Sequence, residues 1–203
     1  MTTRTLIVEI DDTQLVSLPY GINLCIAMQV NCISNVVWAS RKLEHLSKKN
    51  PFQWTDEYQI FGAHADFISN NPLNIRFGQM TTYSADGYIS SPVDDPDVVG
   101  NTIRVHNDFD DAYIGISAKL EGEYLPVFVS PTPLVLQADT DFKPVDNVIV
   151  FWSSTDTTST MTSHITGPSI EVDLTAQATQ TVSFTGPPNQ GKFFPGPLPP
   201  PAA

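Results

Sequence analysis

One stretch of the chain combines aromatic and ionisable residues in a pattern that could form a ligand pocket. Alternate side chains of an extended strand share a face, so Trp54, Asp56 and Tyr58 lie together. The same parity reaches His64 and Asp66 if the strand extends that far. A carboxylate on an apolar face is costly unless it is paired or displayed in a cavity. The spacing therefore predicts a binding pocket with aromatic walls from Trp54 and Tyr58 and polar contacts from the other three residues.

The same residues allow a catalytic interpretation and a structural one. His64 between two carboxylates suits a general base near neutral pH, so one alternative is a small acid–base enzyme (an isomerase, cyclase or hydrolase) that uses Asp56, His64 and Asp66. The structural alternative places Asp56 at a β-bulge, which reverses the parity of the residues that follow. It also places residues 62–66 in a loop whose side chains face water. The spacing is compatible with all three interpretations.

Six aspartates in two expected turns form a second group of candidate residues. A calcium ion takes about 6–8 oxygen ligands, and acidic loops of β-sandwich domains can provide them. Calcium is therefore the one metal that this pattern predicts, and no other cofactor is expected. The alternative is that the aspartates initiate turns and contribute charge, because their spacing lacks the EF-hand register. The six residues are Asp94, Asp95, Asp97, Asp108, Asp110 and Asp111.

The elements that must position these side chains are strands. Apolar and polar residues alternate in most segments, as they do in a strand with one buried and one exposed face. Residues 148–152 are apolar on both faces and predict a central strand. Residues 39–49 are the one plausible helix, with a loop as the alternative. Turn residues such as Asp86 and Gly87 separate the segments. The alternating segments are 6–10, 24–30, 52–60, 73–77, 103–105, 114–118, 170–174 and 182–184.

Segments of this kind predict an all-β protein with about ten to twelve strands. We expect a single-domain antiparallel β-sandwich, or a partly closed barrel, over residues 1–186. Seven of the 17 prolines fall in residues 187–203. Proline has no backbone N–H and cannot join a central strand, so this proline-rich C-terminal tail is expected to be extended or disordered.

Composition excludes several kinds of partner. The 203 residues include 10 Lys+Arg and 22 Asp+Glu, and the resulting net charge of −12 repels a nucleic-acid backbone. No apolar segment approaches the roughly 20 residues of a membrane-spanning helix, and the N-terminus lacks a secretory apolar segment. We therefore expect an acidic, soluble, cytoplasmic protein without a nucleic-acid partner. Cys25 and Cys32 are too few for a disulfide scaffold and are expected to be free thiols.

Carbohydrate binding is the function that these features favour. Aromatic rings suit stacking on the faces of sugars, and loops rich in Asp and Asn can hydrogen-bond sugar hydroxyls. The expected partner is a glycan or another small molecule, bound by a lectin-like β-sandwich. Besides the acid–base enzyme, a self-associating structural, storage or toxin-like protein is an alternative. Its edge strands and proline-rich tail would then form a homo-oligomer.

Overall fold

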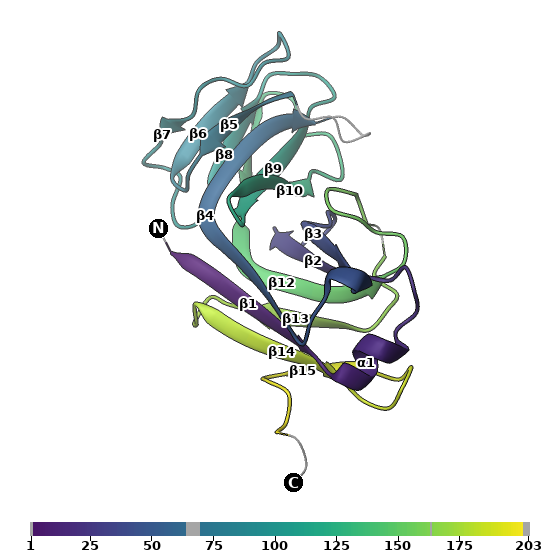
Figure 1. Ribbon diagram of the computed structural model, residues 1–203. Coiled ribbons are helices and arrows are strands. Elements are labelled where there is room, and N and C mark those ends of the chain that lie inside the picture. The colour runs from purple at the N-terminus through teal and green to yellow at the C-terminus, as the bar shows by residue number, and fades with distance from the viewer. Residues whose placement is uncertain (1, 64–69, 163, 201–203) are drawn as a thin grey trace.

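Strands make up most of the chain. The structure is a computed structural model that describes residues 2–63, 70–162 and 164–200, so His64 and Asp66 lie outside the described residues (Figure 1). The described residues form fifteen strands in three sheets, one short α-helix and one 3₁₀ turn, without a closed barrel. The expected all-β, sandwich-like class is confirmed. There are more strands than expected because several are only two to five residues long and show little alternation.

The largest sheet has seven strands. Its order is β10-β9-β4-β1-β14-β15, and β5 pairs with the second half of β4. Neighbouring strands are antiparallel except β1 and β14, which run parallel. The strands are β1 (Thr3–Ile10), β4 (Lys49–Ala63), β5 (Asn70–Ile75), β9 (Tyr113–Leu120), β10 (Glu123–Val129), β14 (Thr179–Thr185) and β15 (Lys192–Pro195).

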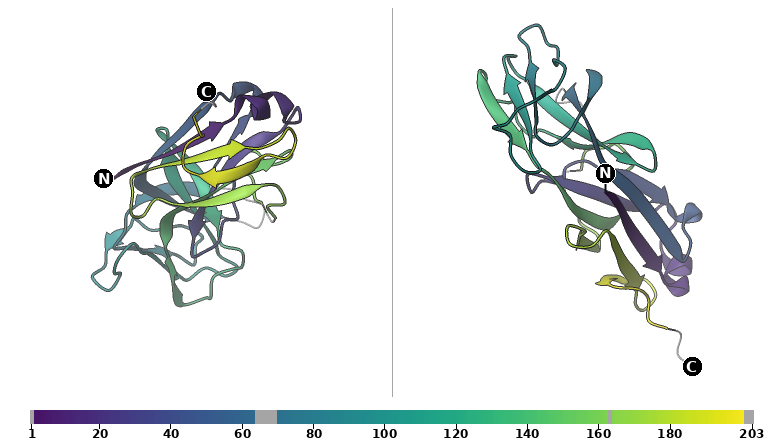
Figure 2. Two further views of the ribbon diagram at one scale, coloured as in Figure 1. Left: turned by 90° about the horizontal axis from the view of Figure 1, so that it is seen from below. Right: turned by 90° about the vertical axis from the view of Figure 1, so that its left-hand side faces the viewer.

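Two four-stranded sheets complete the fold. The second sheet is antiparallel with the order β13-β12-β2-β3, and the third has the order β11-β8-β6-β7 with β6 and β8 parallel. Figure 2 shows an elongated molecule with the third sheet towards one end and β14 and β15 towards the other. The strands are β2 (Asn23–Val30), β3 (Ala39–Lys42), β12 (Pro144–Ser153) and β13 (Ser169–Asp173), then β6 (Gln79–Tyr83), β7 (Val93–Asp94), β8 (Ile103–Asn107) and β11 (Ala138–Phe142).

Side chains from the first and second sheets form the main core. Leu6 of β1 and Ile26 of β2 are fully buried there. Trp38 and Trp54 meet edge to face with their ring centroids 5.3 Å apart. Burial of these large apolar side chains supplies most of the free energy that favours the folded chain.

Residues 148–152 form a central strand, as predicted, but residues 39–49 do not form a helix. Val150 of β12 lies in the main core and Phe151 in a smaller cluster on the opposite face, so both faces are covered. Residues 39–42 are β3, paired with β2, and only Leu43–His45 form a 3₁₀ turn. A short isolated helix is marginal in water, whereas pairing with β2 satisfies the backbone of both strands.

The described part of the proline-rich tail is extended and contacts the body of the protein. β15 pairs with β14, and the ring of Phe193 lies 6.3 Å from that of Trp152 and 4.7 Å from that of Phe184. Further along, the backbone N–H of Leu198 donates to the carboxylate of Glu9 at 2.8 Å. The tail therefore adds an edge strand to the first sheet.

Two long strands change register at β-bulges. β4 shifts against β9 between Thr55 and Tyr58, and β12 shifts against β2 between Val145 and Val148. A bulge leaves residues outside the regular ladder, bends the strand and changes the direction of its side chains. Figure 1 shows both strands curving through the molecule. The bulges place polar residues of β4 and β12 within electrostatic reach of each other.

The remaining elements include the one α-helix, α1 (Asp12–Ser17), which begins where the side chain of Asp11 accepts from the N–H of Thr13. No helix in the described part of the chain is long and apolar enough to cross a membrane.

Cys25 and Cys32 are free thiols, as predicted. Burial raises the pKa of Cys25 to about 12, so this thiol is unreactive at neutral pH.

Candidate functional site

Asp56 belongs to a cluster of charged groups from three strands. It lies in the β4 bulge, where its carboxylate interacts with Arg4 of β1 and Asp146 of the β12 bulge. Arg4 Nη2 donates to Asp146 Oδ2 at 2.6 Å, and the two side chains are only 14% and 13% exposed. Burial raises the pKa of Asp56, and the charge of Asp146 raises it further, against the opposing effects of Arg4 and the Thr2 N–H. The bulge foreseen as a structural alternative is therefore present, and Asp56 forms an electrostatic network with the Arg4–Asp146 ion pair.

Trp54 and Tyr58, which flank the bulge, are core residues. They are 1% and 3% exposed, so neither ring offers a face on which a sugar could stack. Tyr58 packs against Phe77 with ring centroids 5.1 Å apart, and burial raises the pKa of its hydroxyl far above the ordinary value. Asp56 and Tyr58 line one hollow of about 300 Å³, whereas Trp54 lines another of about 540 Å³. The structure therefore does not bring these three side chains around one hollow, and the pocket stays a prediction. His64 and Asp66, the other residues of that prediction, are not described.

The aspartates of the first acidic turn have protein partners. Asp94 accepts from Arg76 Nη2 on both oxygens at 2.8 Å, and Arg76 lowers the pKa of this carboxyl. Asp95 accepts from the backbone N–H of Asp97 at 2.9 Å, which is a turn-forming hydrogen bond. These contacts agree with the alternative that the aspartates form turns and contribute charge.

The second acidic turn is similar. Asp108 lies 3.3 Å from the ring of His106, which also contacts Asp139 at 2.7 Å. Asp110 and Asp111 lie between β8 and β9, and Asp111 has a left-handed φ of 56°. Among the described residues, no group of three or more His, Cys, Asp or Glu side chains could hold a metal ion. Calcium binding stays a prediction for which this part of the chain provides no ligand group.

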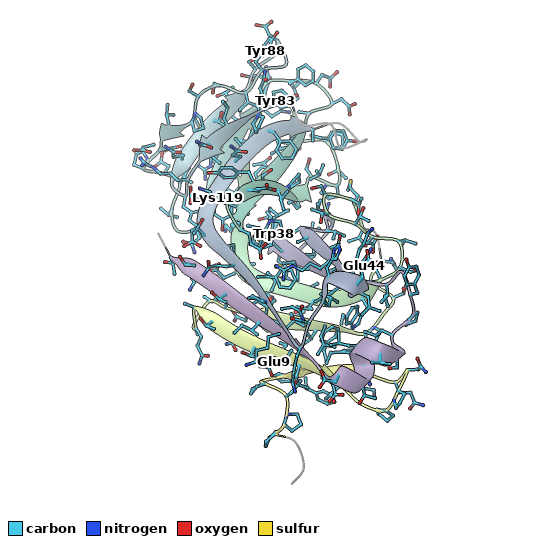
Figure 3. All side chains as sticks on the ribbon, in the orientation of Figure 1. Glu9, Trp38, Glu44, Tyr83, Tyr88 and Lys119 are labelled. Atoms are coloured by element: carbon cyan, nitrogen blue, oxygen red, sulfur yellow. The ribbon has the colours of Figure 1, made fainter. Side chains whose placement is uncertain are left out.

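A hollow at one end of the molecule combines an exposed aromatic ring with unpaired polar side chains. It has a volume of about 630 Å³, and its wall includes Tyr88, which is 68% exposed. Figure 3 shows Tyr88 at the tip of the molecule with Tyr83 beneath it. Asn71 and Asp86 line the same hollow, and their side chains make no hydrogen bond to another described residue. The remaining lining residues are Gly62, Leu73, Gly87 and Ile89.

The turn that carries Tyr88 is fixed by its own hydrogen bonds. The N–H of Ser84 donates to the carbonyl of Tyr88 at 2.8 Å, and the N–H of Gly87 donates to the carbonyl of Ser84 at 2.9 Å. Gly87 has a φ of 81°, and a Cβ at this position would lie 3.3 Å from the Phe109 ring. A glycine is therefore favoured here both by backbone conformation and by space. The tyrosine is presented on a defined turn.

Tyr83 forms the buried side of the hollow. It is 3% exposed and stacks on Phe109 with ring centroids 5.0 Å apart. A Cβ added to Gly62 of β4 would lie 2.8 Å from the Tyr83 hydroxyl oxygen, so the glycine provides the room that this hydroxyl occupies. Burial raises the pKa of Tyr83, which leaves its hydroxyl protonated at neutral pH and able to donate.

Asp86 and Gly87 mark the turn in the sequence, but the hollow beside it has no sequence pattern. Tyr88 lies outside the alternating segments, so no periodic pattern marks it. The one feature that could have indicated the site is that Tyr88 directly follows a turn and belongs to no segment expected to face the core. Asn71 lies on β5, a strand that pairs with β4, and this pairing is a tertiary contact that spacing does not reveal.

Comparison with known proteins adds nothing to this geometry. No protein-family model, no curated protein and no solved structure matches the chain. The function is therefore argued from the residues of the site alone.

Proposed function

We propose that the protein binds carbohydrate at the Tyr88 hollow. The observation that carries the proposal is the exposed Tyr88 ring beside the exposed side chains of Asn71 and Asp86, which make no hydrogen bond to another described residue. A tyrosine ring can stack on the C–H face of a pyranose, and an amide and a carboxylate can pair with the adjacent hydroxyls. Ligand pockets usually combine an apolar wall with a few such polar groups.

Size and charge narrow the class of sugar. A volume of about 630 Å³ lies within the range of roughly 300–1,000 Å³ that is typical of small-molecule pockets, and it suits a mono- or disaccharide unit. The net charge of −12 and the carboxylate of Asp86 disfavour sialylated or sulfated glycans. The expected ligand is therefore a neutral glycan. Because the described residues gather no metal ligand group, binding is expected to persist in a chelator.

A glycan array with the purified protein, with calcium and with a chelator, tests the proposal. We expect selective binding of neutral glycans in both conditions. Tyr88→Ala should weaken it about 30-fold, which corresponds to about 2 kcal/mol for a central aromatic contact. Tyr88→Phe keeps the ring and should retain most of the affinity.

Phe194→Ala serves as the matched control because it removes another exposed aromatic ring, 46% exposed on β15, outside the hollow. It should bind as the unaltered protein does. A blank array in both conditions, or a Tyr88→Ala protein that binds normally, would overturn the proposal. Binding lost only in the chelator would instead support the calcium prediction.

The two other interpretations have not been tested. The acid–base enzyme requires His64 and Asp66, which are not described, and Asp56, which lies in the ion-pair network. The self-associating protein would need an edge strand or the tail as its interface. Both stay predictions, and the exposed ring of Tyr88 favours the carbohydrate proposal over either.

A further inference from the structure

A second exposed tyrosine lies far from the first. Tyr20 is 95% exposed in the connection between α1 and β2. It lines two adjacent hollows, one with a volume of about 510 Å³ and the other of about 340 Å³. The ring therefore stands between two depressions of the surface. An exposed aromatic ring beside a concave surface can form the apolar wall of a ligand site when polar groups lie next to it.

The backbone around Tyr20 is anchored on both sides. The N–H of Ile22 donates to the carbonyl of Pro19 at 3.3 Å, and the N–H of Leu43 donates to the carbonyl of Ile22 at 3.1 Å. Gly21 has a φ of 85°, which lets the chain turn sharply directly after the tyrosine. Ile22 packs against the main core. The exposed ring is thus presented by a short, fixed turn.

Polar side chains line the larger hollow beside Tyr20. Ser154, Asp156 and Thr166 line it, and their side chains make no hydrogen bond to another described residue. The loop that carries Asp156 is nevertheless held in place, because Asn23 Nδ2 donates to its carbonyl at 2.9 Å. The larger hollow therefore combines an exposed aromatic ring with hydroxyl and carboxylate groups, as the Tyr88 hollow combines one with an amide and a carboxylate.

The two places share no residue and belong to different parts of the fold. Tyr88 follows β6 of the third sheet, whereas Tyr20 precedes β2 of the second. Glu44, which lines the smaller hollow beside Tyr20, lies well away from Tyr88 in Figure 3. One small glycan cannot contact both tyrosines.

We infer that Tyr20 and the polar side chains of its larger hollow form a second site for neutral glycans, so that each chain is bivalent. This inference rests on the carbohydrate-binding function proposed for the Tyr88 hollow. Two sites on one chain allow it to bridge glycans on different surfaces and to gain affinity on a surface that displays many of them.

The array separates the two sites when it is probed with single and double variants. The Tyr88→Ala protein should still bind a subset of the glycans. The Tyr20→Ala protein should bind the complementary subset or bind all glycans more weakly. The double variant should bind none. Phe194→Ala is again the control, and circular dichroism confirms that each variant is folded. The unaltered protein should also agglutinate beads coated with the neutral glycans that it binds on the array, whereas each single variant should lose at least tenfold in agglutination titre.

The failures of the two proposals are distinguishable. If Tyr88→Ala alone is blank and Tyr20→Ala matches the unaltered protein in both assays, there is no second site and the proposed function stands. If Tyr20→Ala removes all signals while Tyr88→Ala changes none, the sugar site is at Tyr20 and the Tyr88 assignment is wrong. A blank array for the unaltered protein overturns both.

Discussion

Two polar regions of this protein differ in how far their side chains are open to solvent. Around Asp56, charged groups from three strands are partly or largely buried and interact with one another, although Arg4 Nε and Asp146 Oδ1 have no hydrogen-bond partner among the described residues. Around Tyr88, the ring and the neighbouring side chains of Asn71 and Asp86 are exposed. A buried charge must be paired because desolvation is costly, so its presence says little about ligands. Polar groups around an exposed ring are accessible to a ligand, and they are the better indication of a binding site.

The largest expected effect concerns the buried ion pair. Arg4→Ala should lower the free energy of unfolding by about 2–3 kcal/mol, because it leaves Asp146 buried near Asp56 without its cation. Urea unfolding measures the change. Arg76→Ala is the matched control, since it removes an arginine from a pair with Asp94 that is 69% and 68% exposed, and it should change stability little. Equal losses in both variants would contradict the contrast between buried and exposed pairs.

A smaller loss of stability is expected from a substitution at Gly62, which lies between the Tyr88 hollow and the core. Gly62→Ala places a methyl group 2.8 Å from the Tyr83 hydroxyl oxygen. It should lower the free energy of unfolding by about 1–2 kcal/mol and also weaken glycan binding. Thermal unfolding and the array measure the two effects. The double variant Gly62→Ala with Tyr83→Phe removes the oxygen and should recover part of the lost stability. A double variant that is less stable than Gly62→Ala would show that the clash is not the cause.

Asp56 should respond in the opposite direction from Arg4. The pKa of Asp56 is raised by burial and by Asp146, so its ionisation lowers stability as pH rises through the folded pKa. Asp56→Asn should therefore raise the melting temperature at pH 7, by about 2 °C because solvent screens a half-buried carboxylate. The gain should disappear near pH 3, below the ordinary pKa of an aspartate. A lower melting temperature at pH 7, or loss of a catalytic activity, would restore the interpretation of Asp56 as a functional residue.

The smallest effect is expected at the exposed cluster of β8 and β11. The hydrogen bond to Asp139, and then the charge of Asp108, raise the pKa of His106. Its contribution to stability is fully present below about pH 6.5, the ordinary pKa of histidine, and is lost as pH rises through the folded pKa. Urea midpoints measured from pH 5.5 to 8.5 should fall with pH in the unaltered protein and fall less in His106→Gln. Asp139→Asn should also reduce the slope, and an unchanged slope in both variants would exclude this cluster as its source.

Much of the fold could be predicted because strand pattern is local. Alternation identified most of the longer strands, and the apolar run of residues 148–152 identified the central strand β12. Short elements were missed because they contain too few residues to show a period, as with β7 and β15. Residues 39–42 form a strand only because the edge of β2 offers a partner, which is information from elsewhere in the chain.

The candidate site could be predicted only in part. The parity of Trp54, Asp56 and Tyr58 correctly marked Asp56 as unusual, but a bulge changes parity without leaving a clear trace in the sequence. The partners of Asp56 are distant along the chain, at Arg4 and Asp146. Tyr88 and Asn71 likewise meet around one hollow only after β4 and β5 have paired.

The sequence by itself determined the all-β class, the free state of the thiols and the kinds of chemistry available to this protein. These follow from composition and from a period of two, which are properties of neighbouring residues. The tertiary structure decided which polar groups were consumed by internal pairing and which were left open to solvent. That distinction depends on bulges, strand pairing and burial between segments far apart in sequence, because the free energy of a polar group is set by its surroundings and not by its position in the chain.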